Sequence, residues 1–254
     1  MSKIIDRTGE EGYNKFGSKI IIIGYRNNTD VDIYFPDYDW TICHVQYNKF
    51  KNGNIKCPYE PRVVNNGYVG EGKYKTVENG CNTRSYHTWK SMLTRCYDER
   101  YHIKRPTYTN CYVCNEWLNY QNFAEWYEYN YYEIDGEIMN LDKDILVKGN
   151  NEYGPNTCIF VPQRINDLFC SNSNCRGDLP IGVYKHNCGK FVSECCNGEG
   201  NQKYLGLYDT INEAFLVYKQ YKEKIIREVA NEYFNLIPTT LYLALINYQV
   251  EYDD

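Results

Sequence analysis

Residues 181–219 have the sequence IGVYKHNCGKFVSECCNGEGNQKYLGLYDTINEAFLVYK. Three β-rich runs, 181–185, 190–196 and 203–207, are separated by two short segments rich in Asn and Gly, which favour turns. Thr210 then precedes Glu213 by three residues, a capping-box pattern, and apolar residues recur at helical spacing as far as Val229. The stretch therefore predicts a three-stranded sheet followed by a long packed helix.

The segment before it, 76–170, mixes helical and extended patterns. Residues 85–97 and 117–129 carry apolar side chains at three- and four-residue spacing, which predicts two helices with one buried face each. Residues 142–148 are expected to form a hairpin arm, 158–161 a short strand and 163–169 another helix. The order of elements is therefore helix, helix, hairpin, helix.

The first segment, 1–75, has the pattern of a small all-β module. Its runs 19–25, 31–35 and 40–45 are β-rich and are separated by NNTD and PDYD, which favour turns. We expect a small β-barrel or meander here. The whole chain is then an α+β protein of three modules: a small β-barrel at 1–75, a central ββα domain at 76–170, and a sheet-and-helix domain with C-terminal helices at 176–254.

Charge and hydropathy restrict the partners of the chain. The net charge is −5, so any contact with nucleic acid has to be local rather than driven by a bulk positive field. The longest apolar run, 20–23, is far too short to span a bilayer, and residues 1–11 lack a secretory apolar stretch. We expect no membrane partner and a cytoplasmic location, with the 12 cysteines reduced. The abundance of Tyr, Asn, Lys and Ile favours an AT-rich bacterium or its phage as the source.

Residues 181–219 resemble the DNA-binding domain of plant ethylene-response factors and the similar modules appended to phage endonucleases. The elements GV, GKFV, YLG, YDT and EAF occur in the family's order. The resemblance implies a sheet that enters the major groove of double-stranded DNA while the helix supports it from behind. The positions implied for contact are Tyr184, Lys185, His186, Lys190, Gln202 and Lys203. Basic residues of the family are replaced here by Tyr184, Cys196 and Gln202, so the alternative is a sheet that contacts protein or is merely structural.

The central segment resembles the HNH-type endonuclease-like domains of phages. The resemblance rests on WKSMLTRCY at 89–97, CYVCNEW at 111–117 and LDKDILVKGNNEYGPNTCIFVPQRIN at 141–166. It implies a hairpin and helix that hold one divalent cation against the scissile phosphate, while a His activates water. It implies Asp142, Asp144 and Asn166 as ligands of Mg²⁺ or Mn²⁺, with both carboxylates catalytic. No His lies in LDKDI, so His87 is the candidate replacement. The alternative is that both carboxylates cap turns and pair with Lys143, Lys148 or Arg164.

Two weaker signals complete the list of candidate sites. Lys49, Lys51 and Lys56, with the aromatic Tyr47 and Phe50, could hold a phosphate backbone with a base or sugar stacked beside it. The alternative is a solvated basic hairpin with an aromatic residue that plugs the barrel. Cys111 and Cys114 form a CxxC pair, for which Cys158, Cys170 and Cys175 are candidate further zinc ligands. No second CxxC or HxxxH accompanies the pair, and thiols also pack as small apolar groups, so zinc is not expected.

Two functions follow from these residues. One is a phage DNA-binding protein with metal-dependent endonuclease activity of the homing or mobile type. The other is a non-catalytic phage binding protein, either a regulator or an inhibitor of a host defence system that acts on a host protein. The missing His, the replaced basic residues and the acidic net charge favour the second function.

The three-module division predicts the pattern of limited proteolysis. Composition and periodicity change near Lys75 and near 171–176, so we expect the first cuts by a protease of broad specificity to fall there. Mass spectrometry of the early fragments measures this. Early cuts inside 85–97 or 211–229, with both boundaries intact, would show that the division is wrong.

Overall fold

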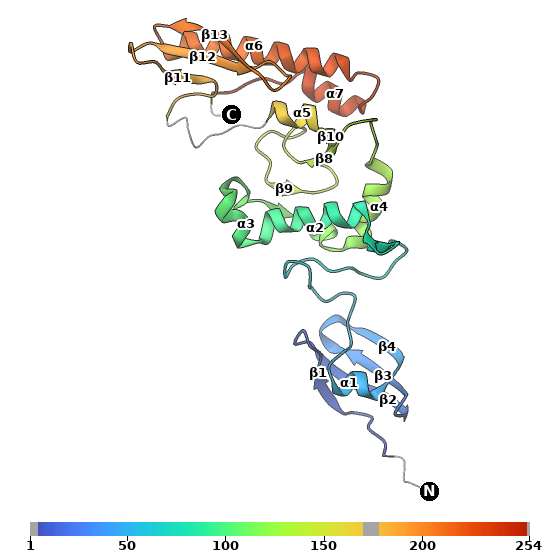
Figure 1. Cartoon of the computed structure of the whole chain (residues 1–254). Coiled ribbons are helices and arrows are strands. Elements are labelled where there is room, and N and C mark those ends of the chain that lie inside the picture. The colour runs from blue at the N-terminus through green and yellow to red at the C-terminus, as the bar shows by residue number, and fades with distance from the viewer. Residues whose placement is uncertain (1–4, 170–177, 253–254) are drawn as a thin grey trace. The chain divides into compact units, whose positions relative to one another are not determined.

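The computed structural model describes residues 5–169 and 178–252, and the chain forms two compact units, Met1–Tyr129 and Asn130–Asp254 (Figure 1). The expected mixture of helices and strands is confirmed, and the strands form several separate sheets. The division into three modules stays a prediction. Its second boundary, 171–176, lies outside the described residues, as do the candidate ligands Cys170 and Cys175. No helix within 5–169 or 178–252 combines the length and apolar character needed to cross a membrane.

The first unit opens with an antiparallel sheet in the order β1-β2-β3-β4. Its strands are β1 (Glu11–Tyr13), β2 (Lys19–Asn27), β3 (Asp30–Phe35) and β4 (Trp40–Val45), followed by helix α1 (Tyr47–Lys51). The runs expected at 19–25, 31–35 and 40–45 are thus confirmed as strands. The expected barrel is wrong, because within the described chain the edge strands β1 and β4 pair with their sequence neighbours alone and the sheet stays open. Closure needs mutually staggered edge strands, and β1 has three residues.

Side chains from α1 and the following loop cover the open sheet. Ile20, Ile22 and Val31 from the strands form one core with Phe50 and Ile55. Of the two alternatives for Phe50, the structure agrees with an aromatic that fills the core, because Phe50 is 4% exposed. The physical reason is that the sheet face needs an apolar cover, and Phe50 of α1 supplies it together with Tyr47, which packs against the same core.

A buried polar cluster fixes the loop after α1 to the sheet. Asn14 donates to the Ile55 carbonyl at 3.3 Å and to Oε1 of Glu60 at 2.7 Å. Ser18 donates to the same carboxylate oxygen. Arg62 Nε lies 3.6 Å from Oε2 of Glu60. The Glu60 carboxylate is thus held by side chains from both ends of the β1–β2 turn.

The rest of the first unit is mainly helical. It contains α2 (Arg84–Tyr97), α3 (Glu99–Lys104) and α4 (Tyr120–Asn130), the short strands β5 (Val77–Glu78), β6 (Cys81–Asn82) and β7 (Tyr112–Val113), and single-turn helices at Pro36–Tyr38, Pro106–Tyr108 and Asn115–Leu118. The helices predicted at 85–97 and 117–129 are confirmed as α2 and α4, the second beginning three residues later. Helix α3 was not expected.

Helix α2 is held by one apolar stripe. Thr83 caps its N-terminus by accepting from the Tyr86 N–H, and Trp89, Met92, Leu93 and Cys96 are buried. The Trp89 indole N–H donates to the Trp117 carbonyl at 2.6 Å. A Cβ added at Gly67 would meet Leu93 at 2.3 Å, so this glycine allows the preceding loop to approach α2. Burial of the stripe therefore orients the rest of α2.

The second unit contains two small sheets and three helices. Strands β8 (Met139–Asp142) and β10 (Ile159–Pro162) pair, with the short β9 (Glu152–Tyr153) in the chain between them, and α5 (Gln163–Leu168) follows. Strands β11 (Val183–Lys185), β12 (Phe191–Cys196) and β13 (Gln202–Tyr208) form the second sheet, followed by α6 (Ile211–Glu232) and α7 (Thr239–Ile246). The three predicted strands, the capping box at Thr210 and the helix after it are confirmed.

The β8–β10 pairing corrects one predicted element. Residues 142–148 were expected as a hairpin arm, but the strand is Met139–Asp142 and residues 143–149 form turns and bends. The Asp142 carboxylate accepts backbone N–H groups at its own strand end, and this local turn competes with continued pairing. The predicted strand at 158–161 and helix at 163–169 are confirmed as β10 and α5.

The buried indole of Trp89 generates a stability prediction. Trp89→Ala removes a fully buried side chain and its hydrogen bond, so we expect the free energy of unfolding to fall by about 3–5 kcal/mol. Urea denaturation followed by circular dichroism measures it. Ile103→Ala is the control, because Ile103 is 81% exposed and its loss should change stability by less than about 0.5 kcal/mol. Equal losses in both variants would contradict the described core.

Candidate functional site

The β8–β10–α5 element has the ββα order that the central segment was expected to contain. The two strands are antiparallel, with Asp142 opposite Ile159 and Asn140 opposite Val161. Helix α5 begins directly after β10, and the Gln163 N–H donates to the Ile138 carbonyl at 2.8 Å. Asn140 Nδ2 also donates to Oε1 of Gln163 at 2.8 Å. These bonds bind the start of α5 to β8, the strand that carries Asp142.

Asp142 ends β8 and is half-buried. Its Oδ1 accepts the backbone N–H groups of Asp144 and Ile145, each at 2.8 Å. Burial raises the pKa of the Asp142 carboxyl, although the two N–H donors act in the opposite direction. The carboxylate thus caps a turn and also pays a desolvation penalty when it is ionised.

Asp144 is exposed and paired with its neighbour. Its Oδ1 lies 2.5 Å from Nζ of Lys143, a buried lysine that also donates to the Asn150 carbonyl at 2.7 Å. A divalent cation on Asp144 would have to displace this ammonium group. The pairing with Lys143 is the alternative that the sequence left open, and it makes Asp144 a poor ligand.

The other two predicted residues of this site lie on helices. Asn166 is half-buried in the middle of α5, which packs against both β8 and β10. His87 has an exposed ring on α2, in the first unit, whereas Asp142 and Asn166 belong to the second. A cation shared by Asp142 and Asn166, with His87 as the base, stays a prediction.

The C-terminal sheet has one face on α6 and one face outward. Cys195 packs against Tyr218 of α6, so it lies on the helix face. Tyr184 pairs with Val192, two residues before Glu194, and Glu194 pairs with Tyr204, so these three lie on the other face. Burial and the Glu194 carboxylate together raise the pKa of Tyr184. The outward face thus presents two exposed tyrosines, 47% and 60% exposed, around one carboxylate.

A β-bulge decides where Lys203 lies. Ser193 pairs with Gly206 but Glu194 pairs with Tyr204, so Leu205 is an extra residue in β13. One extra residue reverses the facing of every side chain beyond it. Lys203 therefore pairs with Cys195 on the helix side, and its Nζ lies 4.9 Å from the ring centroid of Tyr221 on α6.

The remaining predicted DNA contacts differ in their surroundings. Lys190 forms an ion pair with Asp209 at 2.9 Å, and Nδ1 of His186 lies 3.0 Å from the Cys188 thiol in the turn between β11 and β12. Lys185 and Gln202 are exposed. Lys190 and Lys203 are thus exposed but already contact other side chains, and the DNA contact predicted for this sheet stays a prediction.

The predicted lysines of the first unit lie on and after α1. Lys49, Lys51 and Lys56 are exposed, and Nζ of Lys51 lies 3.6 Å from Oε1 of Glu10. Tyr47 donates to the Glu10 carboxylate at 3.0 Å and lies beneath the Arg7 guanidinium. The two aromatic residues expected to accompany these lysines are thus engaged within the protein. The CxxC pair flanks β7, with Cys111 buried and Cys114 half-buried.

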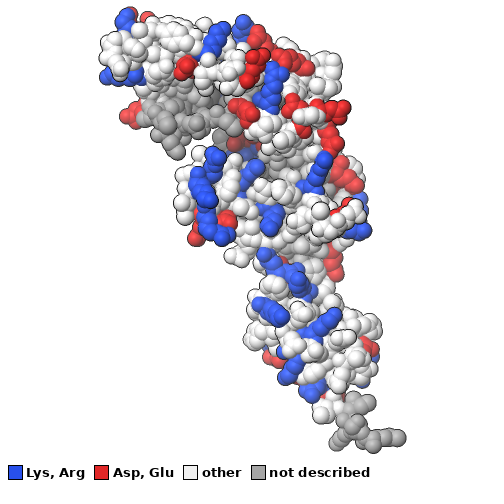
Figure 2. Space-filling model, viewed as in Figure 1, with Lys and Arg blue, Asp and Glu red and all other residues white. Residues whose placement is uncertain are grey.

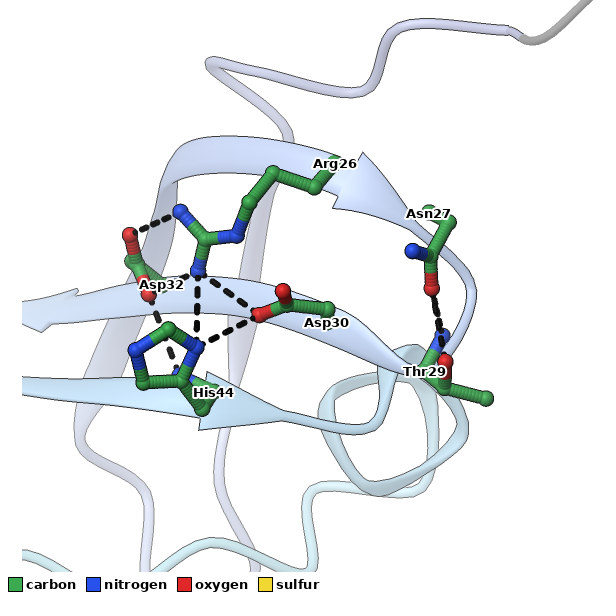
Figure 3. Close-up of polar contacts among 6 residues, drawn as sticks. All are labelled: Arg26, Asn27, Thr29, Asp30, Asp32 and His44. Atoms are coloured by element: carbon green, nitrogen blue, oxygen red, sulfur yellow. Dashed lines mark hydrogen bonds and ion pairs between the residues drawn. The ribbon is translucent and has the colours of Figure 1, made fainter.

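A second polar cluster, which the sequence did not indicate, lies on the N-terminal sheet (Figure 3). The Arg26 guanidinium bonds to Asp30 at 2.7 Å and to Asp32 at 2.6 Å. His44 sits in a bulge with φ 57°, its Nδ1 lies 2.9 Å from Asp30, and its backbone N–H donates to Asp32 at 3.1 Å. The sequence signal that could have revealed part of this cluster is the pair Asp30 and Asp32, because residues two apart in a strand lie on the same face.

This cluster has metal-ligand spacing, but an arginine occupies it. Ligand atoms of Asp30, Asp32 and His44 lie within 4.8 Å of one another, which is unique among the described Asp, Glu, His and Cys residues. The Arg26 guanidinium lowers the pKa of both carboxyls by bonding to each. A cation would have to displace it, so the group is best described as an ion-pair cluster joining β2, β3 and β4.

The environment of Asp142 generates a prediction with two variants. The folded state binds the Asp142 proton more tightly than the unfolded chain does, so ionisation at neutral pH costs stability. An Asn at 142 keeps the acceptor oxygen and has no charge. We expect Asp142→Asn to match or exceed the wild type in free energy of unfolding at neutral pH, and Asp142→Ala to lose about 1–2 kcal/mol.

Urea denaturation measures this pair, with Asp144→Asn as the control for an exposed carboxylate. Equal losses for the Asn and Ala variants would mean that the charge of Asp142, and not its capping oxygen, stabilises the fold.

The predicted site residues therefore fall into separate groups. Asp142 and Asn166 share the β8–β10–α5 element, Lys203 lies against α6, and Lys49 and Lys51 lie on α1. Comparison with family models, curated proteins and solved structures finds no match for this chain.

Proposed function

We propose that this chain is a phage-type protein that binds double-stranded DNA, and that its β8–β10–α5 element is the place where Mg²⁺ or Mn²⁺ would support phosphodiester cleavage. The observation that carries the proposal is the desolvated Asp142 carboxylate at the end of β8, beside a helix fixed to that strand by hydrogen bonds. The proposed cleavage function is inferred from the resemblance of this segment to HNH-type domains. Such a protein acts in the cytoplasm of the host bacterium, where its substrate DNA lies.

Two of the three predicted ligands at this element, Asp142 and Asn166, suit a hard cation. The two N–H groups on Oδ1 hold the Asp142 carboxylate in a fixed orientation. Carboxylate and amide oxygens are the ligands that Mg²⁺ prefers, so Asp142 and Asn166 are the residues that would hold it. Asp144 does not fit, because Lys143 neutralises it. A bound cation would neutralise developing charge on the phosphate, and the desolvation of Asp142 would strengthen that binding.

A second function is favoured by the outward face of the C-terminal sheet. Tyr184, Tyr204 and Leu207 are exposed there beside Glu194, whereas a DNA-reading sheet would present cations. Exposed tyrosines with few charges are typical of the centre of a protein–protein interface. The alternative is therefore a non-catalytic binding protein that attaches to a host protein through this face.

A cleavage assay tests the enzymatic part of the proposal. We expect purified protein to nick plasmid DNA with Mg²⁺ or Mn²⁺, and Asp142→Asn to reduce the rate by about 100-fold or more because a metal ligand is lost. Asp144→Asn is the matched control, and it should keep the rate within about threefold, because Lys143 already engages that carboxylate.

The outcomes separate the two functions. Activity that survives in Asp142→Asn would exclude this element as the catalytic centre. Failure of the wild-type protein to cleave with either metal would remove the nuclease function and leave the binding protein.

A further inference from the structure

Basic side chains are concentrated in one short part of the first unit. Residues 84–108 contain six Lys or Arg and two Asp or Glu, a formal charge of +4 within a chain of net charge −5. The six are Arg84, Lys90 and Arg95 on α2, Arg100 and Lys104 on α3, and Arg105 after it. We call them the α2–α3 basic surface. His87 and His102 lie in the same stretch.

These side chains lie toward solvent because the opposite side of α2 is buried. Trp89, Met92, Leu93 and Cys96 are buried. Arg84 is exposed and Arg95 is half-buried, and the eleven residues between them place both on one side of the helix. Lys90, Arg100, Lys104 and Arg105 are exposed. Figure 2 shows Lys and Arg gathered over α2 and α3, with few acidic side chains among them.

Part of this charge is available to a ligand. Arg100 is engaged by Asp98, the residue that caps α3, at 3.1 Å. Lys90, Lys104 and Arg105 form no ion pair with any carboxylate in the described part of the chain. In contrast, Lys190 of the C-terminal sheet is paired with Asp209 and Lys203 is packed on Tyr221.

The local structure holds the surface in place. The Arg95 guanidinium lies 5.9 Å from the ring centroid of Tyr108, and that ring packs edge-on against Tyr101 of α3. Nε2 of His102 lies 2.8 Å from the Arg95 carbonyl, which joins the end of α2 to α3. The basic side chains therefore stand on a rigid corner of two helices.

The dimensions of the surface match a polyanion. Arg84 and Arg95 are separated by about 16 Å along α2, at about 1.5 Å per residue. Duplex DNA carries one charge per about 1.7 Å of its axis, so that length faces several phosphates of each strand. A single small anion would leave most of these cations unused.

A lipid surface fits less well. Helices that lie on membranes insert an apolar face beside their basic residues. The apolar face of α2 is already buried in the protein, and Ile103 is the one exposed large aliphatic residue between 84 and 108. The surface therefore offers charge without the apolar area that bilayer insertion needs.

We propose that the α2–α3 basic surface is the principal contact of this protein with the phosphate backbone of double-stranded DNA. This inference rests on the proposed DNA binding and assigns it to a surface outside the C-terminal sheet. Contacts of this kind position the protein without reading sequence, so the binding is strongly dependent on salt and weakly dependent on base sequence.

Fluorescence anisotropy of labelled duplex DNA with the full-length protein tests the surface. The variant Lys90→Glu/Lys104→Glu/Arg105→Glu should bind about 100-fold more weakly at low salt, and the slope of log affinity against log salt should fall by up to about 2.7. The control Lys15→Glu/Lys224→Glu/Arg227→Glu has the same net charge change at exposed positions elsewhere. It should keep the affinity within about threefold. Circular dichroism checks that both variants are folded.

Three results would overturn the inference in distinguishable ways. If the wild type binds DNA and both triple variants lose the same amount of affinity, the α2–α3 basic surface is excluded as the principal contact, while the proposed DNA binding remains. A wild-type protein that does not bind duplex DNA at low salt would remove the DNA-binding function together with this contact. If the wild type instead binds phosphatidylserine vesicles, and the first variant does not, the surface is a membrane contact.

Discussion

The second unit depends on helix α6, which packs against one core near its start and against another core further along. Near its start, Ala214 and Tyr218 are buried against the C-terminal sheet, while Ile225, Ile226 and Val229 share a core with α5 and α7. Each fully buried aliphatic side chain contributes about 1.5–3 kcal/mol. The β8–β10–α5 element has two four-residue strands and one six-residue helix, too little to form a core alone. The β8–β10–α5 element therefore depends on α6 to complete its core.

The placement of charge within the fold separates the predicted binding residues from the surface proposed here for DNA. Lys143 and Lys190 neutralise carboxylates beside them, and Lys203 covers an aromatic ring. A lysine used in this way has less to offer a phosphate, because a ligand has to compete with the existing partner. Lys90 on α2, Lys104 at the end of α3 and Arg105 after it form no such ion pair within the described residues. Local charge balance, and not the overall charge of −5, decides where a polyanion can bind.

Asp142 has a structural role, and its cost to the fold motivates the functional role proposed for it. Its Oδ1 caps the turn after β8, yet the buried charge raises its pKa and costs stability when it is ionised. An Asn would cap as well without that cost. Carboxyls whose pKa is raised by burial are common at binding and catalytic sites, and this supports the proposal for Asp142. The same reasoning gives Asp30 and Asp32 a structural role, because Arg26 neutralises both.

The sequence by itself determined the elements whose stabilising contacts are local or periodic. The stripe from Trp89 to Cys96 defined α2, the Thr210–Glu213 pair defined the start of α6, and β-rich runs bounded by turn residues defined β2, β3, β4 and the C-terminal strands. Helix α3 escaped prediction because its residues, ERYHIK, have no apolar periodicity and its N-terminus is fixed by Asp98. A count of charge over 84–108 would have revealed the basic surface without any structure.

The tertiary structure alone decided which face each candidate residue occupies. Leu205 is an extra residue in β13, and the resulting bulge turns Lys203 toward α6, a reversal that no periodic pattern signals. Packing of Phe50 under an open sheet, and the meeting of Arg26, Asp30, Asp32 and His44, likewise depend on pairing between strands. Sequence patterns specify local conformation and burial, whereas the partners of a charged side chain are set by residues that only folding brings near it.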